Sequence, residues 1–174
     1  IGLTEILLKE SPRPEQRSLL NTAASCGEGL LRIVNDLLDF SKIEAGRVRM
    51  LPEPADLVKI AEDSMKLFES RLLERSLEKR VEVEPGFPRS TLIDGQRVRQ
   101  VIQNLLANAI KFTDRGEVAV KAHCCGEDEN SIEFRFEVAD TGIGISKQNQ
   151  ESIFDLFTQE DGSTTRRFGG TGLG

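Results

Sequence analysis

Polar side chains that could bind a metal ion and a phosphate recur along one predicted helix. Residues 95–112 carry Asn104, Asn108 and Lys111 at spacings of four and three, which place them on one helical face. An amide oxygen suits a hard cation such as Mg²⁺, and a lysine meets a phosphate as a point charge. An ordinary solvent-exposed face is the alternative, although such faces normally carry Glu and Lys rather than two amides.

A second group of residues follows a predicted strand that ends at Val138. Asp140 could accept a hydrogen bond from an exocyclic amine, as an adenine would present. Gly142 and Gly144 would allow tight turns and a close approach of the backbone to a ligand. The same residue types also make ordinary turns, so this motif alone leaves both interpretations open.

The third group is the glycine-rich run over residues 166–174, which begins with two arginines. Exposed backbone N–H groups in such a run can cradle phosphates. A flexible polar linker is the alternative, because a lone glycine-rich run is weak evidence. The order of all three groups along the chain favours a binding site.

This order resembles that of the sensor histidine kinases. Four segments match the N, G1, F and G2 boxes of that family, in family order: residues 104–113, 140–145, 154–157 and 170–174. Asp94 and Arg97 match positions before the first box. Residues 35–46 resemble the second helix of the family's dimerisation hairpin, and residues 157–170 are most similar to hybrid kinases, which commonly carry their own receiver domain. The resemblance covers essentially the whole chain.

The resemblance implies a site for ATP and Mg²⁺, with no side chain in a catalytic role. Asn104 would coordinate Mg²⁺, Asn108 and Lys111 would hold the triphosphate, and Asp140 would contact the adenine amine. Residues 158–169 would form a mobile lid. The residues implied to contact the cofactor are Asn104, Asn108, Lys111, Phe112, Asp140, Gly142, Gly144, Ile145, Thr164, Thr165, Gly170, Thr171, Gly172, Leu173 and Gly174.

The implied function is that of a two-component kinase core, which transfers the γ-phosphoryl group of ATP to a histidine for relay to a receiver-domain aspartate. Such a core positions the phosphoryl group and offsets its charge. The implied partners are a second copy of the chain, paired through the hairpin, and a response-regulator receiver domain.

Two alternative functions stay open. The first is an ATP-hydrolysing member of the same fold; such families place a Glu four residues before the magnesium Asn, where this chain has Gln100, which cannot act as a general base. The second is a non-catalytic module for dimerisation or receiver docking. The intact Asn104, Asn108, Lys111 and Asp140 weigh against it.

Two helices are predicted in the first part of the chain. Apolar side chains in residues 1–10 share a helical face, and Pro12 and Pro14 interrupt it. Apolar side chains then recur at alternating spacings of three and four over residues 15–45, which is typical of a helix packed on other helices. Gly46 is predicted to end this helix.

The second part alternates between helices and strands. Asp56 is predicted to cap a helix whose apolar face reaches Leu72, and Val81 lies in a predicted strand. Alternation of apolar and polar residues predicts further strands over residues 117–124 and 131–138. The predicted packing face of the helix over residues 95–112 is formed by Val98, Val101, Ile102, Leu105, Ala109 and Ile110. A further short helix, capped by Ser146, is predicted to carry Phe154 and Phe157.

The net charge separates the two parts. The chain has 174 residues, with 23 basic and 29 acidic side chains and a net charge of -6. Residues 1–51 hold 7 acidic and 7 basic side chains, so the whole excess lies in residues 52–174. We predict a linker at Pro52-Glu53-Pro54.

The predicted fold class is α+β. Residues 1–51 would form part of a dimerisation and phosphotransfer hairpin, which is half of a four-helix bundle. Residues 52–174 would form an ATP-binding α/β sandwich of the histidine kinase, chaperone and topoisomerase ATPase type, incomplete at its C-terminal end. One sheet with helices on one face explains strands that are apolar on only one side.

Composition excludes several classes of function. The acidic balance argues against nucleic acid as a partner, and no apolar run approaches the roughly 20 residues of a membrane-spanning helix, so any membrane attachment lies outside this chain. Cys26, Cys124 and Cys125 lack zinc spacing and favour a reducing cytoplasm, with the thiols buried or half-buried. His123 is predicted to be an exposed strand residue without a role.

Two departures from the family concern the ends of the chain. The phosphoacceptor histidine of the family would lie about three helical turns before Ile1, so this chain is not expected to phosphorylate itself there. The family also continues with a helix and further strands after the residue that matches Gly174. Apolar faces of the sandwich are therefore expected to lack part of their cover.

We predict that the isolated chain binds ATP weakly or unfolds readily, because these covering elements are missing. Titration calorimetry with ATP, on this chain and on one extended through the full sheet, tests this expectation. Equal nucleotide affinities for the two chains would contradict it.

Overall fold

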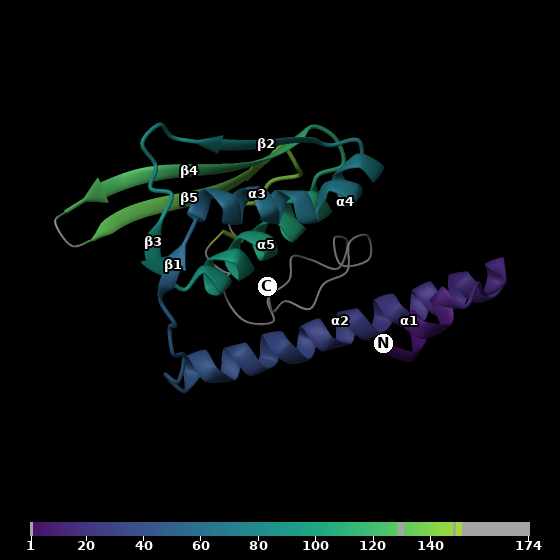
Figure 1. Ribbon diagram of the computed structural model, residues 1–174. Helices are drawn as coiled ribbons and strands as arrows, with labels where there is room; N and C mark the ends of the chain where they lie inside the picture. Colours follow the sequence, from purple (N-terminus) through teal and green to yellow (C-terminus); the bar gives the residue numbers. More distant parts are fainter. Residues whose placement is uncertain (1, 129–130, 148, 151–174) are drawn as a thin grey trace. The chain divides into compact units, whose positions relative to one another are not determined.

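The computed structural model describes residues 2–128, 131–147 and 149–150, and they fall into two compact units. Among the described residues, the first unit ends at Val48 and the second begins at Arg49. The first unit is helical, and the second contains the described strands (Figure 1). Each unit is described by itself.

The first unit is a helical hairpin. Helix α1 (Gly2–Lys9) contacts helix α2 (Pro14–Glu44), beside which it lies in Figure 1. Pro14 occupies the first turn of α2, where its missing N–H would have no helical partner in any case. The predicted pair of helices is confirmed.

Helix α2 ends as its sequence predicts. Gly46 has a φ of +63°, a left-handed conformation that favours glycine. Its N–H donates to the Ile43 carbonyl at 2.9 Å, and the Arg47 N–H donates to the Lys42 carbonyl at 2.8 Å. These bonds satisfy carbonyl groups that the end of a helix leaves free.

The second unit is built on a three-stranded sheet. Strand β4 (Glu117–Glu127) pairs in parallel with β2 (Glu78–Val83) and antiparallel with β5 (Ile132–Asp140). Helices α3 (Leu57–Leu67) and α5 (Gly95–Phe112) pack on one face of this sheet (Figure 1). The fully buried side chains of Val118, Val120 and Ala122 face them. The predicted α/β sandwich is confirmed.

A two-stranded sheet was not predicted. Strand β1 (Glu53–Ala55) pairs antiparallel with β3 (Thr91–Ile93), so the predicted linker at residues 52–54 is wrong: two of its three residues belong to a strand. Three residues are too few to show an alternating pattern, and Pro54 suggests a loop. A proline is tolerated in such a short ladder because an edge strand need not donate every N–H.

The helix predicted from Asp56 to Leu72 is interrupted. Asp56 caps α3 as predicted, its carboxylate accepting the Lys59 N–H at 2.9 Å. The helix ends at Leu67, and Phe68 joins it to helix α4 (Glu69–Glu74). The predicted apolar face stays buried across the break, so the sequence pattern indicated the packing but not the change of direction.

Helix α5 has the predicted bounds but a different packing face. Ile102, Ala109 and Ile110 are buried as predicted, whereas Val101 is 58% exposed and Leu105 is 43% exposed. Leu106, which was not predicted to pack, is fully buried. Apolar side chains occupy more of the surface of α5 than the packed sheet and α3 bury. Helical spacing alone could therefore not predict which of these side chains lie in the core.

Other predicted features fall at the surface. Cys124 is half-buried as predicted, but Cys26 and Cys125 are exposed, Cys26 on α2 and Cys125 at an irregularity in the β4–β5 ladder. His123 is half-exposed, with Nδ1 4.0 Å from the Glu84 carboxylate.

Within the described part of the chain, no helix combines the length and the apolar character that crossing a membrane requires. The helix predicted to carry Phe154 and Phe157 lies outside the described residues.

The two adjacent leucines of α5 provide a matched test of its packing. Leu106→Ala is expected to lower the free energy of unfolding by about 2–5 kcal/mol, because it leaves a cavity in the core. Leu105→Ala, on the exposed side, is expected to cost less than about 1 kcal/mol. Urea unfolding measures both changes, and equal costs would contradict the observed packing.

Candidate functional site

The first turn of α5 is held by Asp94. This buried side chain caps the helix, with Oδ1 accepting the Arg97 N–H at 3.1 Å. Its Oδ2 accepts the N–H of Leu51, at the start of the second unit, also at 3.1 Å. The bonds from the Leu51 and Arg97 amides lower the pKa of the Asp94 carboxyl, because they stabilise its charged form.

The last turn of α5 is held by Arg75. Its guanidinium Nη1 donates to the carbonyls of Ile110 at 3.0 Å and Lys111 at 3.3 Å. Both carbonyls lie at the negative end of the helix dipole, where a cation is favourable. Helix α5 is therefore capped at its start by the adjacent Asp94 and at its end by Arg75, 35 positions before Ile110.

The polar stripe lies on an exposed side of α5. Asn104 and Asn108 are exposed, and neither side chain has a hydrogen-bond partner within the described residues. Lys111 is partly buried, with Nζ 4.7 Å from the centre of the Phe112 ring, and this burial lowers the pKa of its ammonium. The seven-residue span of the stripe corresponds to about 10 Å along the helix axis.

The loop after β5 lies against the C-terminal end of α5. The Ile143 N–H donates to the Phe112 carbonyl at 3.3 Å, and the Gly142 N–H donates to Asp140 Oδ1 at 2.8 Å. A Cβ atom on Gly142 would lie 2.5 Å from the Phe112 carbonyl oxygen. This approach requires glycine and brings Asp140 to the same end of α5 as Lys111.

A threonine fastens the loop on its other side. Thr141 Oγ1 accepts the Glu117 N–H at 3.0 Å and donates to the Arg115 carbonyl at 3.3 Å. Gly116 has a φ of +111°, and a Cβ atom there would lie 2.1 Å from Thr141 Oγ1. The turn before β4 and the loop after β5 are thus packed directly on each other.

The structure brings together the predicted residues around the end of α5. Lys111, Phe112, Asp140 and Gly142 meet there, with Asn108 one turn earlier and Asn104 two turns earlier on the same helix. Gly144 follows in the loop with a φ of +70°, and Ile145 is exposed. The remaining predicted contacts lie outside the described residues: Thr164, Thr165, Gly170, Thr171, Gly172, Leu173 and Gly174.

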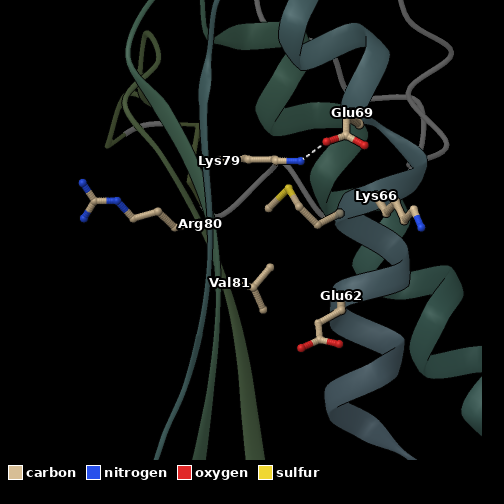
Figure 2. Close-up of a pocket in the computed structure, with 7 residues that line it drawn as sticks. Glu62, Lys66, Glu69, Lys79, Arg80 and Val81 are labelled. Atoms are coloured by element: carbon tan, nitrogen blue, oxygen red, sulfur yellow. Dashed lines mark hydrogen bonds and ion pairs between the residues drawn. The ribbon is translucent and has the colours of Figure 1, made fainter.

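A separate hollow of about 340 Å³ lies between α3, α4 and β2 (Figure 2). Lys79 pairs with Glu69 across this hollow. Arg80 extends away from the helices, and its Nε lies 3.2 Å from Glu117 Oε2. None of the predicted site residues lines this hollow. The hollow therefore lies apart from the predicted residues around α5, and it is not the candidate site.

Two family models match the chain. Residues 1–46 match the His Kinase A (phospho-acceptor) domain, and residues 93–174 match the histidine kinase-, DNA gyrase B- and HSP90-like ATPase. The sensor histidine kinase GacS of Pseudomonas protegens is 37% identical over 174 residues, which are all of this chain and 19% of that protein. Both domain matches thus fall within one alignment of the whole chain to a sensor histidine kinase.

The chain belongs to the histidine kinase family.

Other histidine kinases support this assignment. Hybrid signal transduction histidine kinase L of Dictyostelium discoideum is 36% identical over 177 residues, which are all of this chain and 10% of that protein. The solved structure of full-length ShkA in complex with AMPPNP superposes with a TM-score of 0.74 at 31% identity, covering 99% of this chain and 35% of that chain. The chain spans about a fifth or less of the curated kinases it matches.

Several residues that shape the candidate site of this histidine kinase were not singled out from the sequence. Arg75 reaches α5 from 35 positions away, and Thr113 and Thr141 act through hydroxyl contacts with neighbouring loops. No local pattern signals such contacts, because they depend on the fold. Thr113 directly follows Phe112 and Thr141 lies between Asp140 and Gly142, so their places in the predicted motifs were the signal that could have found them.

Gly142 provides a direct test of the observed loop packing. Gly142→Ala is expected to lower the free energy of unfolding by about 1–3 kcal/mol, because the added methyl group overlaps a backbone carbonyl. Gly126→Ala is the control, since its nearest neighbour would lie 3.9 Å away at the other end of the β4–β5 hairpin. Thermal unfolding with equal losses for the two variants would contradict the close approach.

Proposed function

We propose that this chain is the core of a hybrid-type sensor histidine kinase, which binds ATP with Mg²⁺ and transfers the γ-phosphoryl group to a histidine for relay to a receiver-domain aspartate. One observation carries the proposal. The loop of Asp140 packs on the end of the helix whose exposed side presents Asn104, Asn108 and Lys111. These are the residue types that a nucleotide with its metal ion needs, on two adjoining segments.

The residues fit an adenine at the end of α5. Asp140 uses Oδ1 for the Gly142 amide, and Oδ2 has no partner within the described residues, so it can accept from an exocyclic amine. The Phe112 ring and exposed Ile145 offer apolar surface to the base. The absence of a side chain at Gly142 lets the loop of Asp140 lie against the Phe112 carbonyl, beside this surface.

The exposed side of α5 fits the phosphates. We assign Lys111 and Asn108 to the triphosphate and the Asn104 amide oxygen to Mg²⁺. Gly170, Gly172 and Gly174 would border the phosphates, and Gly144 would let the loop after β5 turn. Bound Mg²⁺ would offset phosphate charge during transfer. The acidic balance of this part of the chain is compatible with such a site, because the metal ion, Lys111 and backbone amides supply the positive charge.

Transfer is favoured over hydrolysis by Gln100. Its Oε1 accepts from Arg97 Nη1 at 2.8 Å, so the amide is already engaged by its own helix. An amide has no basic group that could take a proton from an attacking water. A hydrolysing enzyme of this fold would need a base at this position.

We further propose that the hairpin of residues 1–51 pairs with a second copy into a four-helix bundle, while residues 52–174 bind ATP. Helix α2 exposes Leu30, Val34 and Leu37 along the predicted seam. Burial of such a stripe against another hairpin is the usual way to remove it from water. A receiver domain is the proposed phosphate acceptor, and the cytoplasm is the proposed location.

Asn104 tests the proposed function most simply. In the full-length protein, Asn104→Ala is expected to lower the rate of phosphate transfer from ATP to the acceptor histidine about a hundredfold or more, because the metal ion loses its protein ligand. Gln103→Ala on the same helix is the control and should keep the parent rate. Transfer from labelled ATP at the parent rate in Asn104→Ala would disprove the assigned role.

A further inference from the structure

Thr113 is a buried polar residue at the edge of the proposed nucleotide site. It follows Phe112 as the residue that ends α5, with an extended backbone, and its side chain is fully buried. Burial of a hydroxyl is unfavourable unless it finds hydrogen-bond partners. The partners of this hydroxyl therefore indicate why a threonine lies here.

The Thr113 hydroxyl lies between two acceptors. Its Oγ1 is 2.7 Å from the Ala109 carbonyl oxygen and 3.4 Å from Asp140 Oδ1. One proton thus serves a backbone carbonyl of α5 and the carboxylate of the neighbouring loop, a three-centre arrangement common at helix ends. The hydroxyl links the helix of the phosphate-binding residues to the residue proposed to contact adenine.

The two contacts on Asp140 fall on the same carboxylate oxygen. Oδ1 accepts the Gly142 N–H at 2.8 Å and faces the Thr113 hydroxyl, whereas Oδ2 has no partner among the described residues. A carboxylate held at one oxygen has its rotation restricted, so its other oxygen keeps a fixed direction. Charged acceptors make the stronger hydrogen bonds, which favours this orientation over a free rotamer.

We propose that Thr113 is a positioning residue for nucleotide specificity: with the Gly142 amide, it orients Asp140 so that Oδ2 meets the exocyclic amine of a 6-aminopurine. The inference rests on the proposed function, in which Asp140 contacts adenine. Thr113 does not touch the base in this account. It acts through Asp140, so its removal should affect recognition of the amine and not of the phosphates.

The test compares two nucleotides that differ only in that amine. In the full-length protein with Mg²⁺, dissociation constants are measured for ATP and for purine riboside 5′-triphosphate, which lacks the 6-amino group. Thr113→Val removes the hydroxyl and keeps the shape. It is expected to weaken ATP binding about tenfold and leave binding of purine riboside triphosphate unchanged, so the preference for ATP falls about tenfold.

Three further variants make the result specific to the hydroxyl. Thr113→Ser keeps the hydroxyl and should keep the preference for ATP. Thr22→Val removes a hydroxyl whose one partner within the described residues is the Ser18 carbonyl at 3.0 Å, four residues earlier, and should change neither constant. Asp140→Ala should abolish the preference. If Thr113→Val does not fold, Thr113→Ser and Thr113→Ala form the comparison, since both lose the methyl group and only one keeps the hydroxyl.

The outcomes separate the inference from the function on which it rests. A parent preference in Thr113→Val, with the preference lost in Asp140→Ala, would overturn the role of Thr113 alone. Equal weakening of both nucleotides in Thr113→Val would also overturn it, because the hydroxyl would then serve only the fold. A parent preference in Asp140→Ala would contradict the proposed adenine contact itself.

Discussion

The packing of the loop after β5 on the end of α5 is the contact on which the site depends. Ile143 bonds the Phe112 carbonyl, and Gly142 approaches that carbonyl more closely than any side chain would allow. Together with the Thr113 hydroxyl, this contact joins Asp140 to the end of the helix that carries the polar stripe. Glycine is therefore required at position 142 for packing, apart from any role in binding, because a side chain there would hold the two segments apart.

Helix α5 can present its polar stripe because other segments fix both of its ends. Asp94 joins its first turn to Leu51, and Arg75 holds the carbonyls of its last turn. Leu106 fixes its inner side in the core. The stripe can then carry Asn104 and Asn108, whose amides have no partner among the described residues, because the stability of the helix comes from packing and from capping at its ends.

The sequence predicted this helix and its polar residues well, since caps and helical periodicity are local properties. It did not predict which apolar side lies inside, because Val101 and Leu105 are as apolar as the residues that are buried. Strands β1 and β3 escaped notice because three residues carry no period. Contacts such as that of Arg75 with Ile110 join segments far apart in sequence, so only the fold reveals them.

Amide hydrogen exchange of the full-length protein, with and without ATP and Mg²⁺, tests the central claim most directly. Nucleotide binding is expected to slow exchange in residues 104–113 and 140–145, which form the two sides of the proposed site. Residues 78–83 form β2, of which Lys79, Arg80 and Val81 line the separate hollow; they should exchange at unchanged rates. Slower exchange confined to residues 78–83, with none at 104–113 or 140–145, would contradict the account.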